Sequence, residues 1–252
     1  MPKIKQLAAR QRIRRALLLL SLLLFPITLY YFSPALTIQS SAEGIISGSF
    51  IVFGLMLLVS LFLGRLWCGW ACPAGALQEL AMPINNNRAP RKRLRWIKWA
   101  IWVPWIGLIA SMAIHAGGYT RVNPTYQIDG GLTLLQSDPP WFAVYYVILA
   151  LFVLPAVVLG RRSACHSVCW MAPFMILGRK ARNALRWPAL RLTADEEACT
   201  DCERCTRTCP MSLDVNNLIH RATMEHSDCI LCGNCVDACP KDVIHYSFSS
   251  GR

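Results

Sequence analysis

Two cysteine runs near the end of the chain constrain its fold more than any other feature. The first reads Cys199-x-x-Cys202-x-x-Cys205-x-x-x-Cys209-Pro210, and the same spacing returns thirty residues later as Cys229-x-x-Cys232-x-x-Cys235-x-x-x-Cys239-Pro240. This is the spacing of bacterial ferredoxins with two 4Fe–4S clusters, in which the fourth cysteine of each run ligates the cluster of the other run. We therefore expect cluster 1 to be held by Cys199, Cys202, Cys205 and Cys239, and cluster 2 by Cys209, Cys229, Cys232 and Cys235.

The residues around these runs predict a small domain that depends on its clusters. Residues 193–252 contain no long apolar run, so they cannot bury much core, and the clusters must stabilise the fold. We expect an α+β domain like that of the two-cluster bacterial ferredoxins. Zinc is the alternative metal, but zinc motifs use two cysteine pairs rather than two runs of three plus one. Thiolate ligation without disulfides suits a reducing cytoplasm.

The rest of the chain is dominated by apolar blocks. Of all residues 54% are hydrophobic, and about 20 consecutive apolar residues can cross a bilayer as a helix. Four blocks qualify: 16–32, 44–66, 96–115 and 141–159. We therefore predict an all-α membrane domain over residues 16–178, with four transmembrane helices arranged as two hairpins. Prolines inside the blocks are tolerated in membrane helices and mark kinks.

The charges are distributed unevenly along the chain, whose formal net charge is +12. Residues 1–192 hold 21 Lys and Arg against 4 acids, whereas residues 193–252 hold 5 against 10. Basic residues beside apolar spans indicate membrane topology, so nucleic acid is not an expected partner. The loops 33–43 and 116–140 contain Arg121 as their one basic residue. The positive-inside rule then predicts a multi-pass protein of the bacterial inner membrane with both termini in the cytoplasm.

This topology assigns the remaining segments. Residues 1–15 form a basic cytoplasmic N-terminus, and residues 179–192 are expected to be a basic linker on the anionic inner leaflet. The first span could instead be a cleaved signal peptide, because Ser40–Ser41–Ala42 offers small residues for cleavage. We favour an uncleaved anchor, which keeps the number of spans even.

A second pair of cysteine motifs follows the second and fourth spans. Each span ends in Leu-Gly-Arg and is followed by Cys-x-x-x-Cys, giving the two CxxxC pairs Cys68 with Cys72 and Cys165 with Cys169. Cysteines four residues apart share one face of a helix, and the repeat suggests an axis along the membrane normal. We expect the four sulfurs to meet and ligate a third metal or iron–sulfur centre. Reduced structural thiols and a redox-active dithiol are the alternatives.

Taken together, the four spans, the two CxxxC pairs and the C-terminal two-cluster domain resemble the NapH family of membrane iron–sulfur proteins. The most specific match is Trp67-Cys68-Gly69-Trp70-Ala71-Cys72-Pro73, and related architectures occur in NosR-like and CcoG-like proteins. The resemblance implies a quinol dehydrogenase subunit that passes electrons between the quinone pool and a partner reductase. The partner would be a periplasmic or membrane redox subunit.

The implied quinone site has only weak candidates in the sequence. They lie near the expected periplasmic edge and can exchange protons or hydrogen bonds with a quinone ring: His115, Tyr119, Arg121, Tyr126 and Asp129. His115 is the one histidine in an expected span, so this chain cannot provide two axial histidines for a haem in the bilayer.

The resemblance to CcoG-like proteins implies a second class of function. The chain could be an assembly or maintenance factor that reduces a metal ion or cofactor of another respiratory enzyme. Met171 and Met175 lie close to Cys169 in the sequence and would be residues to test for that role. The direction of electron flow, the quinone type and the oligomeric state stay open.

Overall fold

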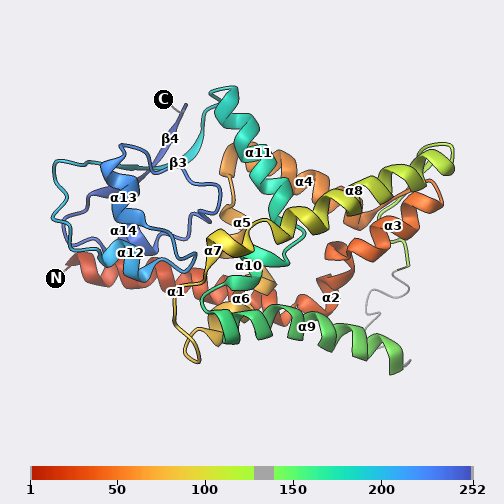
Figure 1. The fold of residues 1–252 in the computed structure, drawn as a ribbon, viewed down its shortest axis with the longest axis horizontal. Helices are drawn as coiled ribbons and strands as arrows, with labels where there is room; N and C mark the ends of the chain where they lie inside the picture. The colour runs from red at the N-terminus through yellow and green to blue at the C-terminus, as the bar shows by residue number, and fades with distance from the viewer. Residues whose placement is uncertain (1, 128–138, 251–252) are drawn as a thin grey trace.

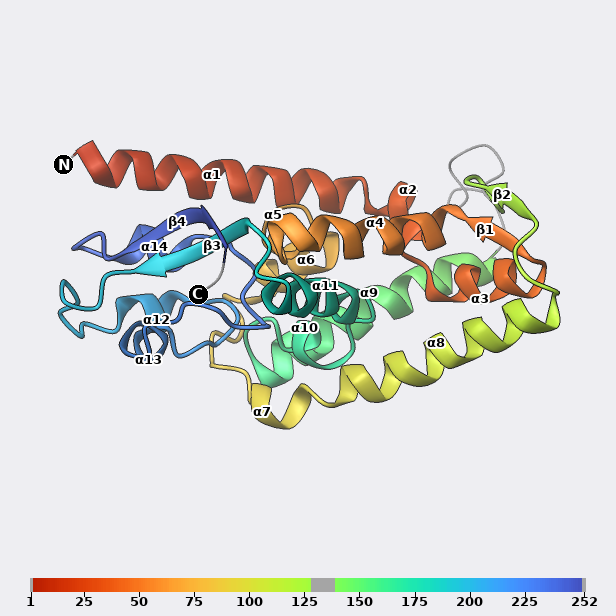
Figure 2. The ribbon, with the colours of Figure 1, turned by 90° about the horizontal axis from the view of Figure 1, so that it is seen from above.

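The computed structural model describes residues 2–127 and 139–250. A body of helices forms most of the molecule, and a small domain with two cysteine runs caps one end of it (Figure 1). Both ends of the chain lie at the end of the molecule that carries this small domain (Figure 2).

The body contains helices of very different lengths. They are α1 (Pro2–Leu23), α2 (Phe25–Thr28), η1 (Leu29–Phe32), α3 (Pro34–Ala42), α4 (Gly48–Leu63), α5 (Leu66–Trp70), α6 (Pro73–Ala81), α7 (Arg91–Leu94), α8 (Ile97–His115), α9 (Pro139–Leu159), α10 (Ser163–Ser167) and α11 (Ala172–Ala184). At the far end from the small domain, β1 (Ile45–Ser47) pairs in parallel with β2 (Arg121–Asn123).

The apolar blocks are helical, but they are not four uninterrupted long helices. Within the described residues, α8 alone is long and apolar enough to cross a membrane as one helix. The first block adds a second candidate only if Ala9–Leu23 and Phe25–Phe32 count as one span, because they are bent by 60° at their junction. Pro26 explains this break, since a proline removes a backbone donor and clashes with the preceding turn.

The second and fourth blocks form shorter apolar helices, Gly48–Leu63 and Ala143–Leu159. The second is shortened because residues 45–47 are used in β1. The stretch 33–43, which we expected to be a loop, contains α3. Ser33 caps that helix by accepting a hydrogen bond from the backbone of Leu36, and Pro34 starts it.

The small domain has the predicted α+β character. β3 (Ala189–Ala194) pairs antiparallel with β4 (Ile244–Ser249), and the register places Ala189 opposite Ser249. Helices α12 (Arg204–Thr208), α13 (Val215–His220) and α14 (Asn234–Ala238) complete it, with α12 packed on α14 and α13.

The backbone of the two cysteine runs repeats in detail. Asp201 and Glu203 of the first run have φ angles of 52° and 54°, and the equivalent Leu231 and Gly233 have 50° and 80°. Glu203 thus adopts the left-handed conformation that Gly233 takes at no steric cost. Each of these two residues is the N-cap of a short helix that carries the third cysteine of its run.

The expected basic linker over residues 179–192 needs correction. Residues 179–184 are the second half of α11, and β3 already begins at Ala189. Arg179 and Arg182 are buried rather than spread on a lipid surface. Both form ion pairs with Glu225 of the small domain, so their positive charges hold the helical body against that domain.

Helix α1 extends past the body and runs along the small domain (Figure 2). Arg10 pairs with Asp237 at 2.8 Å, and the Gln11 amide donates to the Cys232 carbonyl at 3.1 Å. A single hydrophobic core continues from the body into the small domain. The two cysteine-bearing parts of the chain are therefore held against each other.

Candidate iron–sulfur sites

The two CxxxC pairs are built in the same way. In each, a short helix (α5 or α10) carries the first cysteine, the second cysteine follows that helix, and another helix (α6 or α11) comes next. Pro73 occupies the first turn of α6 and Pro173 that of α11, where a proline is tolerated. All four cysteines are free and buried: Cys68, Cys72, Cys165 and Cys169.

The structure brings these four cysteines into one group. Burial, and after it the neighbouring Cys165 and Cys68, raise the pKa of Cys169 to about 12. The pKa of Cys72 is also raised, first by burial and then by Cys68, Cys165 and Cys169. Because the sulfurs lie within each other's electrostatic field, the two halves of the repeat contribute to one site. Iron would supply the positive charge that buried thiolates need.

Polar and sulfur atoms surround this group. The Gln78 amide donates to the Cys165 sulfur at 3.1 Å, and the Sδ atom of Met175 lies 3.7 Å from the Cys68 sulfur. Arg65 and Arg162 each stand three residues before the first cysteine of a pair and are fully buried. A centre with four thiolate ligands carries net negative charge, so two adjacent guanidinium groups suit it.

The cysteines predicted to hold cluster 2 also lie together. Cys209, Cys229, Cys232 and Cys235 line one cavity, whose other walls include apolar residues such as Leu213 and Ile230. Burial raises the pKa of Cys232 to about 12 and that of Cys209 to about 11. The fourth cysteine of the first run thus lines the same cavity as the first three of the second run. These residues fit a 4Fe–4S cluster.

Three of the four cysteines predicted for cluster 1 form a second group. Burial raises the pKa of Cys205, with Cys199 and Cys202 as close neighbours. Cys202 is exposed, so this group lies at the outside of the domain. Cys239 follows α14, which packs on the helix that carries Cys205, and its sulfur accepts a bond from the Val243 backbone at 3.4 Å.

The loop of cluster 2 rests on the helix that carries Cys68. The Trp70 indole donates to the Leu231 carbonyl at 3.0 Å. Next to it, a Cβ atom at Gly69 would overlap the Ile230 carbonyl oxygen. Between the CxxxC group and the cavity of cluster 2, the backbone of α5 thus packs directly on the backbone of the cluster 2 loop.

Buried ion pairs fix this contact, and no sequence pattern indicates them. Asp228, next to Cys229, forms ion pairs with Lys98 at 2.9 Å and with Arg65 at 3.3 Å through one carboxylate oxygen. His166 lies 3.9 Å from the second oxygen. Burial alone would raise the pKa of Asp228, but Lys98 and Arg65 hold it well below its usual range. His166 is therefore buried beside this carboxylate rather than at the surface.

Four of the quinone-site candidates predicted from the sequence lie in the described residues and away from the cysteines. They surround β2 and the end of α8, at the opposite end of the molecule from the small domain (Figure 2). His115 and Arg121 are exposed, and the Tyr119 hydroxyl is 2.9 Å from that of Ser41. The Tyr126 hydroxyl bonds to Glu43 at 2.7 Å. Asp129 lies outside the described residues.

Fold and sites together define an iron–sulfur electron-transfer protein with a two-cluster ferredoxin-like domain. Comparison with known proteins agrees: a family model described as a 4Fe–4S dicluster domain matches residues 198–244. A second, described as a 4Fe–4S binding domain, matches residues 47–96, which include Cys68 and Cys72. No solved structure matches the chain.

The curated relatives that the chain resembles include ferredoxin-type 4Fe–4S proteins. The ferredoxin-type protein NapH of Escherichia coli is 24% identical over 86% of this chain and 76% of NapH. The methylamine utilization ferredoxin-type protein MauN of Methylobacillus flagellatus is 27% identical over 74% of this chain and 66% of MauN. The putative electron transport protein YccM of Escherichia coli is 24% identical over 73% of this chain, which spans 51% of YccM.

Proposed function

We propose that this chain is a membrane-bound component of quinol dehydrogenase type. It passes electrons between the quinone pool and a partner reductase through 4Fe–4S clusters. The observation that carries the proposal is the continuous packing of three cysteine groups. The CxxxC group lies in the core of the body, cluster 2 packs on it through Gly69 and Ile230, and cluster 1 lies at the surface.

The clusters that the chain can hold provide acceptors for the electrons that quinol oxidation releases. A quinol that becomes a quinone releases two electrons and two protons, and 4Fe–4S clusters, which each take one electron, supply the acceptors. The protein's residues position the sulfurs, exclude water from Cys68 and Cys72, and compensate charge through Arg65 and Arg162. Cys202 is exposed, so a partner can approach cluster 1 from outside.

The third centre at the CxxxC group is part of the proposal. The group offers four buried sulfurs, two buried arginines and the amide of Gln78, a donor set that suits an iron–sulfur cluster better than isolated structural thiols. The match of a 4Fe–4S binding family model over Cys68 and Cys72 supports the same interpretation.

The membrane placement is also proposed. Exposed apolar side chains cover the body, including Leu23, Leu58, Val147 and Val158, and a bilayer would remove them from water. Both termini and the small domain lie at one end of the molecule. Combined with the basic loops, this supports a protein of the bacterial inner membrane with both termini in the cytoplasm.

One contact favours the second candidate function, reduction of a metal for another enzyme. The thioether of Met175 lies 3.7 Å from the Cys68 sulfur, and soft thiolate and thioether ligands suit Cu(I) as well as iron–sulfur clusters. The four buried cysteines would then bind copper rather than iron.

Iron analysis tests the proposal and separates these two candidates. Protein purified without oxygen should contain about twelve irons per chain, as three 4Fe–4S centres require. Changing Cys68, Cys72, Cys165 and Cys169 to serine should lower this to about eight, while the ferredoxin-type electron paramagnetic resonance signals persist. About eight irons in both proteins would contradict the third cluster, and copper in the unchanged protein that is absent from the variant would favour the metal-reducing function.

A further inference from the structure

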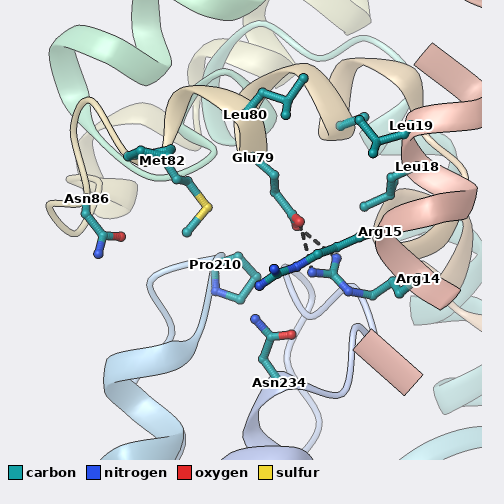
Figure 3. A pocket seen from close by; sticks show the side chains of 12 residues that line it. Arg14, Arg15, Leu18, Leu19, Glu79, Leu80, Met82, Asn86, Pro210 and Asn234 are labelled. Carbon is teal, nitrogen blue, oxygen red and sulfur yellow. Dashed lines mark hydrogen bonds and ion pairs between the residues drawn. The ribbon is translucent and has the colours of Figure 1, made fainter. Parts of the chain in front are cut away.

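A cavity of about 450 Å³ opens between α1 and α6, beside the ferredoxin-like domain. Figure 3 shows α1 contributing Arg14, Arg15, Leu18 and Leu19 to its wall. The α6 side contributes Glu79 and Leu80, and the ferredoxin-like domain contributes Pro210 and Asn234. Its volume lies within the range of small-molecule sites, roughly 300 to 1,000 Å³.

The mouth of this α1–α6 pocket is apolar and open to the side of the molecule. Leu19 is 45% exposed and Leu80 is 54% exposed. Leu20 on α1 and Ile84 after α6 continue the exposed apolar surface. In the proposed membrane placement, these residues face lipid chains, so a hydrophobic ligand could enter sideways from the bilayer.

The inner end of the α1–α6 pocket reaches cluster 2. Pro210 directly follows Cys209, and Asn234 directly precedes Cys235. Both cysteines belong to the cavity assigned to cluster 2. A ring bound against Pro210 and Asn234 would therefore lie next to a redox centre. A lipid with a purely structural role has no need of such a position.

The wall of the pocket carries one acidic residue, Glu79, and two basic residues, Arg14 and Arg15. Glu79 binds Arg14 at 2.9 Å and Arg162 at 2.6 Å, as part of the wall. Within the described part of the chain, Arg15 makes no hydrogen bond or ion pair, and its side chain points across the pocket toward Pro210 (Figure 3). Arg15 is therefore a free donor for a carbonyl oxygen of a neutral ring. Its unpaired charge would also attract a lipid phosphate, so experiment must separate the two ligands.

We propose that the α1–α6 pocket binds the ring of a membrane quinone or quinol, with its apolar tail leaving between Leu19 and Leu80. Arg15 donates a hydrogen bond to a ring oxygen, and the packing of Pro210 and Asn234 holds the ring beside cluster 2. This inference rests on the proposed function and names its substrate site. It places the site at the cytoplasmic edge, away from His115 and Tyr119.

Photoaffinity labelling tests this placement without depending on turnover. An azido-quinone is irradiated with the cluster-loaded protein in lipid nanodiscs, and the labelled peptides are identified by mass spectrometry. We expect label in residues 15–19 and 79–83, with displacement by unmodified quinone. Label confined to residues 115–127 would overturn the pocket and leave the proposed function standing.

Two variants measure the contribution of the pocket itself. Leu19→Trp fills the mouth from an exposed position, and Arg15→Met removes the free donor; each should weaken quinone binding about tenfold or more, measured by titration. Leu20→Trp is the matched control, because Leu20 is exposed on the same helix but does not line the pocket. Binding that is equally strong in all three variants contradicts the inference.

The outcomes also separate the inference from the proposed function. If quinol reduces the clusters in the unchanged protein but not in Leu19→Trp, both are supported. If quinol reduces the clusters equally in both proteins, only the pocket is wrong. Native mass spectrometry that finds a tightly held phospholipid, which quinone does not displace, would assign the pocket to a lipid and overturn the inference.

Discussion

Gly69 shows how one residue controls the contact between the two parts of the molecule. A Cβ at this position would overlap the Ile230 carbonyl oxygen and come within 3.4 Å of the Cys232 backbone. We predict that Gly69→Ala pushes the cluster 2 loop away and destabilises the protein by about 1–3 kcal/mol, as overpacking does. The check is thermal unfolding together with the magnetic interaction between the clusters.

Gly54→Ala is the matched control for this prediction. Gly54 lies inside α4, and nothing is within 4 Å of a Cβ built there. Alanine also favours a helix over glycine by about 1 kcal/mol, so this variant should unfold no earlier than the unchanged protein. Equal behaviour of the two variants would show that the Gly69 contact is unimportant.

At the same scale, the sequence proposes ligands but does not indicate their surroundings. The spacing of the two runs was enough to propose that Cys209 joins Cys229, Cys232 and Cys235, because local geometry dictates this exchange. The ion pairs of Asp228 could not be predicted, since Arg65 and Lys98 are more than a hundred residues away in the chain. Many basic residues were available, and only the fold selects among them.

At the scale of whole elements, helix α11 is held against the ferredoxin-like domain by ion pairs. Its Arg179 and Arg182, together with Arg191 of β3, surround Glu225 of the ferredoxin-like domain. Burial alone would raise the pKa of Glu225, but the hydrogen bond and charge of Arg179 outweigh it and bring this pKa down to about 2. The ionised carboxylate therefore holds α11 against the domain.

This arrangement predicts a defined pH dependence. Because the folded pKa lies below the ordinary value of 4.5, the stabilisation is complete above that value and is lost as pH falls toward 2. Glu225→Gln should lower the free energy of unfolding by about 3 kcal/mol at neutral pH. The difference between the two proteins, followed by thermal unfolding, should stay constant from pH 7 to 5 and shrink below about 4.5.

The exposed Glu197 provides a comparison for that experiment. Glu197→Gln should change the unfolding temperature little at any pH, since surface charges contribute little. A loss of stability in Glu225→Gln no greater than in Glu197→Gln would contradict the role assigned to the arginines.

The helices and strands were predicted only in part, for physical reasons. Apolar composition located the helical blocks but could not show that Pro26 breaks the first or that residues 45–47 leave the second for a strand. The basic residues 179–192 were interpreted as a linker because charge density alone suggests solvent or lipid headgroups. Their partner, Glu225, lies outside that segment, so composition alone could not identify it.

At the scale of the whole molecule, the fold and the proposed membrane placement predict a defined orientation in the membrane. Both termini and the ferredoxin-like domain share one end, whereas β1, β2 and the end of α8 lie at the other. Alkaline phosphatase fused after residue 120 should be active, and fused after residue 252 it should be inactive. Green fluorescent protein at the same positions should give the reverse result. Active phosphatase at the C-terminus would contradict the proposed topology.

The proposed function rests on the claim that the clusters exchange electrons with quinone, which one experiment on the purified protein tests. The protein is purified without oxygen in detergent, mixed with a menaquinol analogue, and followed by absorption and electron paramagnetic resonance. We predict rapid reduction of the clusters that a quinone-site inhibitor blocks. Clusters that dithionite reduces but quinol leaves oxidised would contradict the claim and favour a soluble electron donor.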